Sequence, residues 1–312
     1  MSENHRSIRE DEIDLIEMFL VLWNKKLIII LITGLVSIGS IFYSLSLPNI
    51  YKSQAIISSA SSSSGNLSSA ISQYSGLADM AGISLPAQGG SDKFSMGLEV
   101  IKSLSFFEKL IEKYGLFFEL QAPKGWNPSD NSLVIDPEIY DVEESKWISD
   151  DRFAKNGKPS IQKAHRDFLY NLSIDVDKQT KFVHITYSHF SPNVAKKVLD
   201  SILLEINEIS RTEDIAMSEE SIKYLQKERA GTQFTEVKSG INSIIQNRIE
   251  TIALAKASQE YLVKVLSEPY VPELKSLPDR KFIVILSFIL SSVLSSIFFL
   301  ALHFFRKNSS EG

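Results

Sequence analysis

The side chains that could carry out chemistry are two histidines and several paired carboxylates, and their spacing favours surface positions over a reactive site. His184 and His189 are five residues apart on or beside a predicted strand. Side chains alternate between the two faces of a strand, so this spacing places the two imidazoles on opposite faces and argues against a shared metal ion. The acidic doublets at 143–144, 150–151 and 219–220 are typical of a solvated surface.

The common catalytic and phosphate-binding motifs are missing from the sequence. Gly157 and Lys158 are followed by Pro159 and lack the upstream glycine of a phosphate-binding loop. There is no G-x-G-x-x-G, G-x-S-x-G or H-E-x-x-H sequence. Cysteine is absent, which excludes disulfides, thiolate nucleophiles and cysteine metal sites. We therefore predict no catalytic residue, no cofactor and no metal ligand, and we expect a protein that is not an enzyme.

The charge balance also excludes one class of partner. The 312 residues carry 33 lysines and arginines against 38 aspartates and glutamates, for a net charge of −5. Nucleic-acid binding requires clustered positive charge, and no such cluster stands between the two apolar segments. We therefore expect no nucleic-acid partner.

Two long apolar segments, residues 27–47 and 282–305, organise the chain. Neither contains a lysine, arginine, aspartate or glutamate. At about 1.5 Å per residue, each is long enough to cross a hydrocarbon core of roughly 30 Å. The first segment lacks a small-residue cleavage site behind it, so we interpret it as an uncleaved anchor and not a signal peptide. The sequence therefore predicts two transmembrane helices with one large block, residues 48–281, between them.

The orientation follows from the tails, residues 1–26 and 306–312. Both tails carry lysine and arginine close to the membrane, which favours the cytoplasmic side. Arg280 and Lys281, just before the second segment, give the opposite signal, but long translocated segments largely ignore this rule. We therefore expect both termini in the cytoplasm and residues 48–281 outside it. Residues 11–26 predict an amphipathic helix that lies on the membrane surface or binds a partner.

The block between the spans mixes strand and helix patterns. Residues 51–57 predict a strand, and residues 172–176 and 181–187 predict a hairpin. Helical spacing of apolar residues predicts one helix over 94–114, closed by Gly115. Residues 117–159 are expected to be irregular with one short helix, and 161–170 a second short helix.

Very long helices are predicted over about 192–264. Ser191 and Pro192 have the pattern of an N-cap followed by proline in the first turn, and no further proline occurs before Pro269. We expect one very long helix or a helical hairpin that turns near residues 231–235. Helices of this length usually pack along an apolar seam. The candidate positions for packing between copies are Val198, Ile202, Ile206, Ile209, Ile241, Ile245, Ile249 and Ile252.

Three prolines precede the second span. Pro269, Pro272 and Pro278 are incompatible with a helix interior or a central strand and predict an extended path back to the membrane.

Several short motifs occur in a fixed order between the two terminal spans. They are residues 11–17 with Leu22 and Trp23, 51–55, 77–83, 98–110 with Lys102 and Ser103, 191–195, and the prolines 269, 272 and 278 with Arg280. Each motif is weak alone, but their order is fairly specific. In this order the chain resembles the Wzz chain-length determinants, the polysaccharide co-polymerases of bacterial inner membranes.

The resemblance implies an α/β base domain near the membrane and long helices that project into the periplasm, an α+β fold. It implies a homo-oligomer that sets the length of a lipid-linked polysaccharide together with a Wzy-type polymerase, in contact with the inner membrane and with the growing polysaccharide. Because only residues 306–312 follow the second span, the form without a cytoplasmic kinase domain is expected.

The sequence departs from the family pattern in two ways. Leu277 stands where the family usually has serine, and the second span lacks glycine. Ser287, Ser291 and Ser295, at four-residue spacing, can provide the same close helix packing. With the three prolines, these serines are our candidate residues for coupling to the membrane and the polymerase.

A second function class has the same two-span layout. A periplasmic adaptor of a capsule or polysaccharide export system would also need surfaces and no catalytic groups. Neighbouring genes for a flippase and polymerase favour the length regulator, whereas genes for an outer-membrane exporter favour the adaptor.

Overall fold

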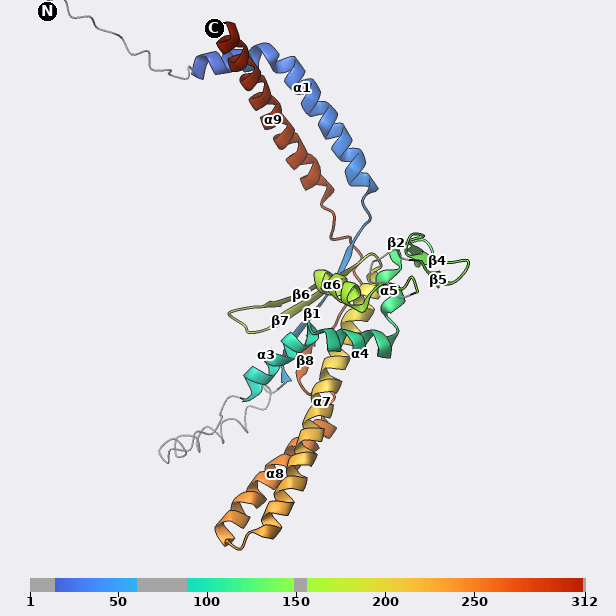
Figure 1. Cartoon of the computed structure of the whole chain (residues 1–312), viewed down its shortest axis with the longest axis vertical. Helices are drawn as coiled ribbons and strands as arrows, with labels where there is room; N and C mark the ends of the chain where they lie inside the picture. Colours follow the sequence, from blue (N-terminus) through green and yellow to red (C-terminus); the bar gives the residue numbers. More distant parts are fainter. Residues whose placement is uncertain (1–14, 61–88, 149–155, 311–312) are drawn as a thin grey trace, which may run out of the picture. The chain divides into compact units, whose positions relative to one another are not determined.

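The computed structural model describes residues 15–60, 89–148 and 156–310, and the chain divides into two compact units. One unit holds Met1–Pro48 with Ser276–Gly312, and the other holds Asn49–Lys275. The first unit consists of α1 (Leu15–Ser46) and α9 (Arg280–Ser310), which pack along each other. The predicted α+β class with a long apolar helix near each end is confirmed (Figure 1).

The second unit contains the remaining elements, whose bounds are as follows. The strands are β1 (Tyr51–Ser59), β2 (Pro123–Asn127), β3 (Ser132–Ile135), β4 (Tyr140–Asp141), β5 (Lys146–Trp147), β6 (Leu172–Val176), β7 (Val183–His189) and β8 (Val263–Ser267). The helices are α3 (Gly89–Ile101), α4 (Leu104–Tyr114), α5 (Phe117–Gln121), α6 (Ile161–Asn171), α7 (Pro192–Gly231) and α8 (Thr235–Ala257).

A four-stranded antiparallel sheet with the order β6-β7-β1-β8 forms the base of this unit. Alternate residues of β7 are buried, as expected for a sheet covered by helices on one face. The predicted hairpin is confirmed, because β6 and β7 pair with Ile174 opposite Ile185. The predicted strand at 51–57 is also confirmed and extends to Ser59 as β1.

The core lies between the sheet and helices α4, α6 and α7. Phe107 on α4 packs against Phe168 on α6, with ring centroids 5.1 Å apart, and Phe168 packs against Tyr187 on β7 at 5.6 Å. Leu199 and Ile202 on α7 are fully buried in the same cluster. At roughly 1.5–3 kcal/mol for each large apolar side chain removed from water, this cluster is the main source of stability for the base.

Helix α7 begins as the sequence predicts. The hydroxyl of Ser191 accepts a hydrogen bond from the backbone N–H of Val194, and Pro192 occupies the first turn. The helix then continues beyond the sheet and turns at residues 232–234 into α8, which packs back along it (Figure 1). The predicted helical hairpin and the position of its turn are therefore confirmed.

The helix predicted over 94–114 is wrong as one continuous element. It is divided into α3 and α4, because the hydroxyl of Ser103 accepts a hydrogen bond from the N–H of Phe106 and starts a new helix. Gly115 ends α4 with a φ of 66°, a left-handed conformation that glycine adopts without steric cost. The predicted stop at Gly115 is confirmed.

The predicted end of the long helices near residue 264 is also wrong. Helix α8 ends at Ala257, and Val263–Ser267 instead forms β8, which pairs with β1. Burial along this strand falls from buried Val263 to exposed Ser267 without alternating, and no glycine or proline separates the strand from the helix. The sequence alone therefore extends the helix too far.

The segment predicted to be irregular contains α5 and two small hairpins, β2–β3 and β4–β5. Trp147 on β5 lies edge-on to Tyr140 on β4 and to Phe117 on α5, with centroid distances of 5.1 and 5.4 Å. These aromatic contacts hold the β4–β5 hairpin to the body of the unit. The predicted short helix at 161–170 is confirmed as α6.

Candidate functional site

The two apolar helices have the burial expected of membrane spans. Met18–Ser46 and Arg280–Phe305 are long and apolar enough to cross a membrane, and only 11% and 6% of their most apolar windows are buried in the protein. A core helix of a soluble protein would be mostly covered by other side chains, and these helices are not. At one end of α1, Lys26 Nζ lies 3.8 Å from the centroid of the Trp23 ring, a pairing suited to the membrane–water interface.

Small polar residues lie where α1 and α9 pack on each other. Ser295 is buried, and Ser287 and Ser291 are half-buried, while most large apolar side chains of α9 are exposed. On α1, Thr33 and Ser44 are buried. Small residues let two helix backbones approach closely, which is the usual basis of helix packing in lipid. The predicted serine positions therefore fall on the covered side of α9.

Arg280 joins the ends of the two helices. Its guanidinium donates from Nε to the carbonyl oxygen of Ser44 at 3.1 Å and from Nη2 to that of Leu47 at 3.3 Å. Ser44 lies in the last turn of α1 and Leu47 directly follows the helix. At this end of a helix the backbone carbonyls lack helical partners, and the helix dipole favours a positive charge. Arg280 stands just before the second apolar segment, where its charge conflicts with the preference of lysine and arginine for the cytoplasmic side. Its hydrogen bonds to Ser44 and Leu47 give the charge a structural role at this position.

The three prolines before α9 have different surroundings. Pro269 and Pro272 are buried in the second unit, and Pro278 is half-buried in the first. Within the second unit, Ser53 Oγ on β1 donates to the carbonyl oxygen of Tyr270 at 2.7 Å, which fixes this segment to the sheet. No helix occurs between Ser267 and Arg280, so the extended path is confirmed for this described part of the chain.

Four of the eight positions predicted to pack between copies lie in the core of a single chain. Val198, Ile202, Ile206 and Ile209 are all buried against the sheet and helices of their own unit. Side chains covered in this way offer no surface to a second copy, so this part of the prediction is corrected. The spacing of the apolar residues predicts that one face of the helix is buried, but it does not identify the segment that packs against that face.

The other four positions lie on α8. Ile241, Ile245 and Ile252 are half-buried and Ile249 is 55% exposed. They remain candidates for contact between copies.

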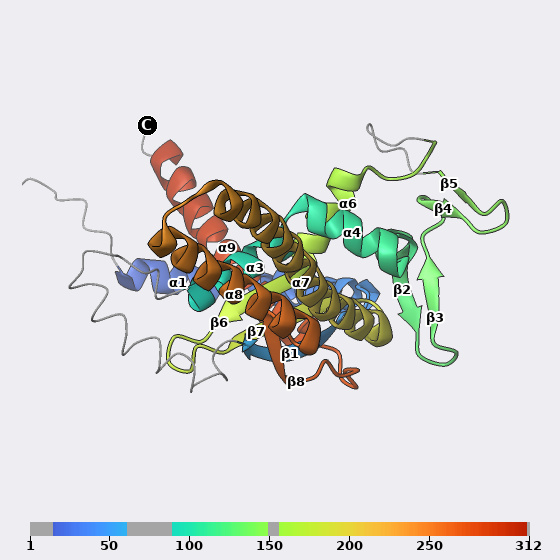
Figure 2. The same cartoon turned by 90° about the horizontal axis from the view of Figure 1, so that it is seen from below.

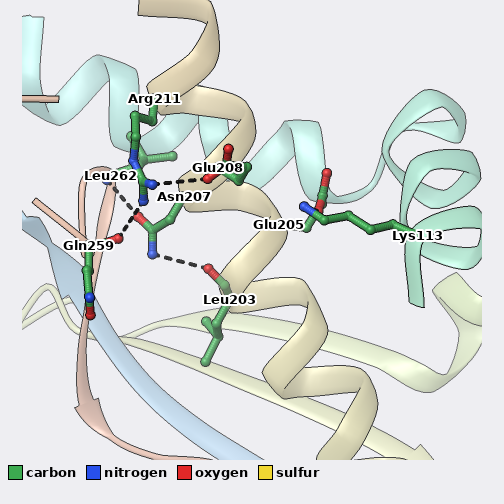
Figure 3. A network of polar contacts seen from close by, with 8 residues as sticks. All are labelled: Lys113, Leu203, Glu205, Asn207, Glu208, Arg211, Gln259 and Leu262. Atoms are coloured by element: carbon green, nitrogen blue, oxygen red, sulfur yellow. Dashed lines mark hydrogen bonds and ion pairs between the residues drawn. The ribbon is translucent and has the colours of Figure 1, made fainter. Parts of the chain in front are cut away.

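A network of polar residues lies where α7 passes the start of β8 (Figure 3). Asn207 Oδ1 accepts from the backbone N–H groups of Leu262 and Val263 at 2.8 and 3.0 Å. Asn207 Nδ2 donates to the carbonyl oxygens of Leu203 and Val263 at 3.1 and 3.2 Å. The amide therefore acts as a strand partner and fastens the return segment to α7.

Two ion pairs flank Asn207 (Figure 3). Glu205 is only 4% exposed, and its carboxylate accepts from Lys113 Nζ on α4 at 2.7 Å. This hydrogen bond raises the pKa of the Lys113 ammonium. Arg211 donates to Glu208 at 3.0 Å and to the carbonyl oxygen of Gln259 at 2.9 Å, so it ties α7 to the segment after α8.

These residues border an open groove, which we call the α7 groove. Its volume is about 890 Å³, and it is lined by Lys113, Tyr114, Leu204, Arg211, Glu260 and Glu268 among others. This volume lies within the roughly 300–1,000 Å³ of small-ligand sites. Sequence reasoning missed the groove and Asn207. The sequence gives little signal for them, because several polar residues, among them Asp200 and Glu208, also interrupt the apolar pattern of this part of α7.

The histidines and carboxylates that could do chemistry are not brought together. Ser191 N–H donates to His189 Nδ1 at 3.0 Å, so Nε2 carries the proton and donates to the carbonyl oxygen of Glu119 at 3.0 Å. Burial lowers the pKa of His189 to about 4, which keeps it neutral at pH 7. His184 lies on the other face of β7, as predicted, with Nδ1 2.9 Å from Gln54 Nε2.

Of the acidic doublets, 143–144 and 219–220 are exposed as predicted, and 150–151 lies outside the described residues. Within the described ranges, no three histidine or carboxylate side chains are grouped as metal ligands would be.

Comparison with known proteins confirms the family resemblance. Residues 11–114 match the family described as Wzz, chain length determinant protein. This match starts before the first span and ends with α4. No curated protein matches the chain.

Solved structures similar to this chain include two polysaccharide co-polymerases. A full-length bacterial polysaccharide co-polymerase is 14% identical, with a TM-score of 0.37, over 94% of this chain and 99% of that one. A fragment of WzzB, a polysaccharide co-polymerase from Salmonella Typhimurium, is 11% identical, with a TM-score of 0.30, over 73% of this chain and 100% of that one.

The central role of Asn207 gives a stability prediction. Asn207→Leu leaves two buried N–H groups and the carbonyl of Val263 without this partner, and each unsatisfied group costs about 1–3 kcal/mol. We expect a lower thermal midpoint for the detergent-solubilised variant by circular dichroism. Asn247→Leu, at an exposed position on α8, is the matched control and should change the midpoint little. Equal midpoints for both variants would contradict the role of Asn207.

Proposed function

We propose that this chain regulates the length of a lipid-linked surface polysaccharide, such as lipopolysaccharide O antigen. The observation that carries the proposal is the match of residues 11–114 to the chain length determinant family. The two apolar helices, one near each end, support it, because they fit an inner-membrane protein of this kind. The bond-forming chemistry is assigned to a Wzy-type polymerase, beside which the chain acts as a scaffold.

The proposed topology places residues 48–281 in the periplasm and both tails, residues 1–26 and 306–312, in the cytoplasm. Lysine and arginine in both tails favour this orientation. Arg280 no longer weighs against it, since its guanidinium is held by the carbonyl oxygens of Ser44 and Leu47. The spans are then residues 27–47 and 282–305, continued at their ends by the rest of α1 and α9.

A scaffold can set length without a reactive group. It needs to change only the balance between continued elongation and release of the polymer. A free-energy difference of about 1.4 kcal/mol changes a competing rate tenfold. Contacts of ordinary strength between the scaffold, the polymerase and the growing polysaccharide are enough for this.

Coupling to the polymerase is assigned to the proline segment and the serine side of α9. Pro269 and Pro272 are held in the second unit, and Pro278 precedes the second span by a few residues. Ser287, Ser291 and Ser295 then continue along the helix that packs on α1. A stiff lead-in joined to a packed helix pair transmits a displacement better than a flexible linker would.

Deletion of the gene tests the function directly. Surface polysaccharide from the deletion strain should still be made, but its modal length distribution should be lost and shift toward short chains. Complementation with the wild-type chain, with Glu219→Ala or with His184→Ala should restore the distribution fully or in part. Gel electrophoresis of the extracted polysaccharide is the measurement.

Two results would count against a non-catalytic regulator. Complete loss of polymer with a single stably expressed carboxylate or histidine variant would indicate a catalytic role. Polymer of normal length that stays inside the deletion strain would favour the export adaptor.

The proline segment has its own prediction. The triple variant Pro269→Ala, Pro272→Ala, Pro278→Ala should reach the membrane at wild-type amounts but give an altered length distribution, because its lead-in to α9 is more flexible. The control is Glu273→Ala, an exposed position in the same segment. Unchanged banding with all three prolines replaced would reduce the segment to a simple connector.

A further inference from the structure

The sheet of the second unit ends in two different surfaces. Its order β6-β7-β1-β8 makes β6 one edge strand and β8 the other. Beside the first edge, residues 176–182 join the ends of β6 and β7 in a turn that we call the hairpin tip. The α7 groove lies beside the second edge and includes Val265 of β8. In Figure 2 the hairpin tip projects to the left, and the chain that leaves β8 runs to the right.

The hairpin tip has a hydrogen-bonded turn and carries two exposed lysines against one aspartate. Asp177 Oδ1 accepts from the backbone N–H groups of Gln179 and Thr180 at 2.7 and 3.0 Å, which fixes the turn. Its two lysines, Lys178 and Lys181, are exposed and form no ion pair with another described residue.

The tip also carries apolar surface. Val176 and Phe182 flank the turn and are 53% and 40% exposed. A preformed turn with both charge and apolar surface can bind with little loss of conformational entropy.

The α7 groove has the complementary character. The two cationic side chains that line the groove already form ion pairs: Lys113 pairs with Glu205, and Arg211 pairs with Glu208. Glu260 and Glu268 are exposed and have no ion-pair partner in the described chain. The groove is therefore acidic at these two positions.

The groove offers apolar contact as well, at Leu204, which is 62% exposed. One backbone donor of β8 is already occupied, because Val265 N–H donates to Glu260 Oε1 at 2.9 Å. Side-chain docking therefore fits this edge better than the addition of another strand.

We infer that the hairpin tip of one copy binds in the α7 groove of a second copy. Lys178 and Lys181 then lie against Glu260 and Glu268, and the apolar flank of the tip lies against Leu204. The contact deepens the proposed function, on which it rests, by naming the surfaces through which the scaffold assembles. Two copies use different patches, so the contact repeats head to tail and closes into a ring when the rotation allows it.

The absence of cysteine makes the contact directly testable. Lys178→Cys and Glu268→Cys are introduced together, and membranes are oxidised before electrophoresis without reductant. The expected product is a ladder of covalent species larger than a dimer, because each copy is joined to a neighbour on both sides. Each single-cysteine variant should stay monomeric, since the contact does not bring identical residues together.

A matched pair controls for random collision. Lys178→Cys with Glu219→Cys places the second thiol at an exposed position far along α7 and should give no ladder. If both thiols of the Lys178→Cys, Glu268→Cys variant react with maleimide and no ladder forms, the contact is wrong. A ladder from the control pair or a dimer from a single variant would also overturn it. A groove that instead holds sugar or another protein would give no ladder.

Charge exchange gives an independent test. Lys178→Glu with Lys181→Glu should reduce the fraction of large oligomer in detergent at least tenfold by light scattering. Adding Glu260→Lys and Glu268→Lys should restore it. Failure of the restored variant to assemble would contradict the pairing.

The inferred contact can fail separately from the proposed function. A deletion strain that loses length control, together with a paired-cysteine variant that gives no ladder, overturns only the contact. Unchanged polysaccharide length on deletion overturns the function whatever the cross-links show.

Discussion

The antiparallel pairing of β1 with β8 is the constraint on which the second unit depends. β1 is the first strand of the chain and β8 the last, yet they are hydrogen-bonded neighbours in the sheet. The contact of Ser53 Oγ with the carbonyl of Tyr270 extends this alignment beyond the end of β8. The chain therefore leaves the second unit at the same end of the sheet at which it enters.

The pairing of these strands requires α7 and α8 to return the chain to the sheet. Asn207 makes the return specific, because its amide satisfies two N–H groups and one carbonyl at the start of β8. An apolar side chain at this position could pack but could not satisfy these groups. In any other register of the returning segment, some of these buried groups would lack a hydrogen-bond partner, which costs stability. The contact therefore selects one register.

Local signals in the sequence predicted the elements that depend on local interactions. The spans, the β6–β7 hairpin, the cap at Ser191 and the stop at Gly115 all follow from composition or short-range spacing. The strand β8, the core location of Ile202 and the α7 groove could not be predicted in this way. Each depends on a contact between segments far apart in the chain, such as Asn207 with Leu262, and periodicity does not identify the neighbour that covers a stripe.

The same distinction between local and distant contacts applies to the candidate side chains. His189 is accounted for by two hydrogen bonds within its own neighbourhood, and His184 lies on the other face of one strand. The apolar stripe of α7 was equally regular, but its first half is covered by the sheet, and the four α8 positions remain partly exposed.

The central claim is that two spans hold the block between them outside the cytoplasm, where the polysaccharide is proposed to be extended. Single cysteines at Glu219 and at Ser309 in the cysteine-free chain, treated with a membrane-impermeant maleimide, test it most directly. In intact spheroplasts the account predicts labelling of Glu219→Cys alone, with Ser309→Cys labelled only after lysis. Labelling of Ser309→Cys in intact spheroplasts, or protection of Glu219→Cys until lysis, would contradict it.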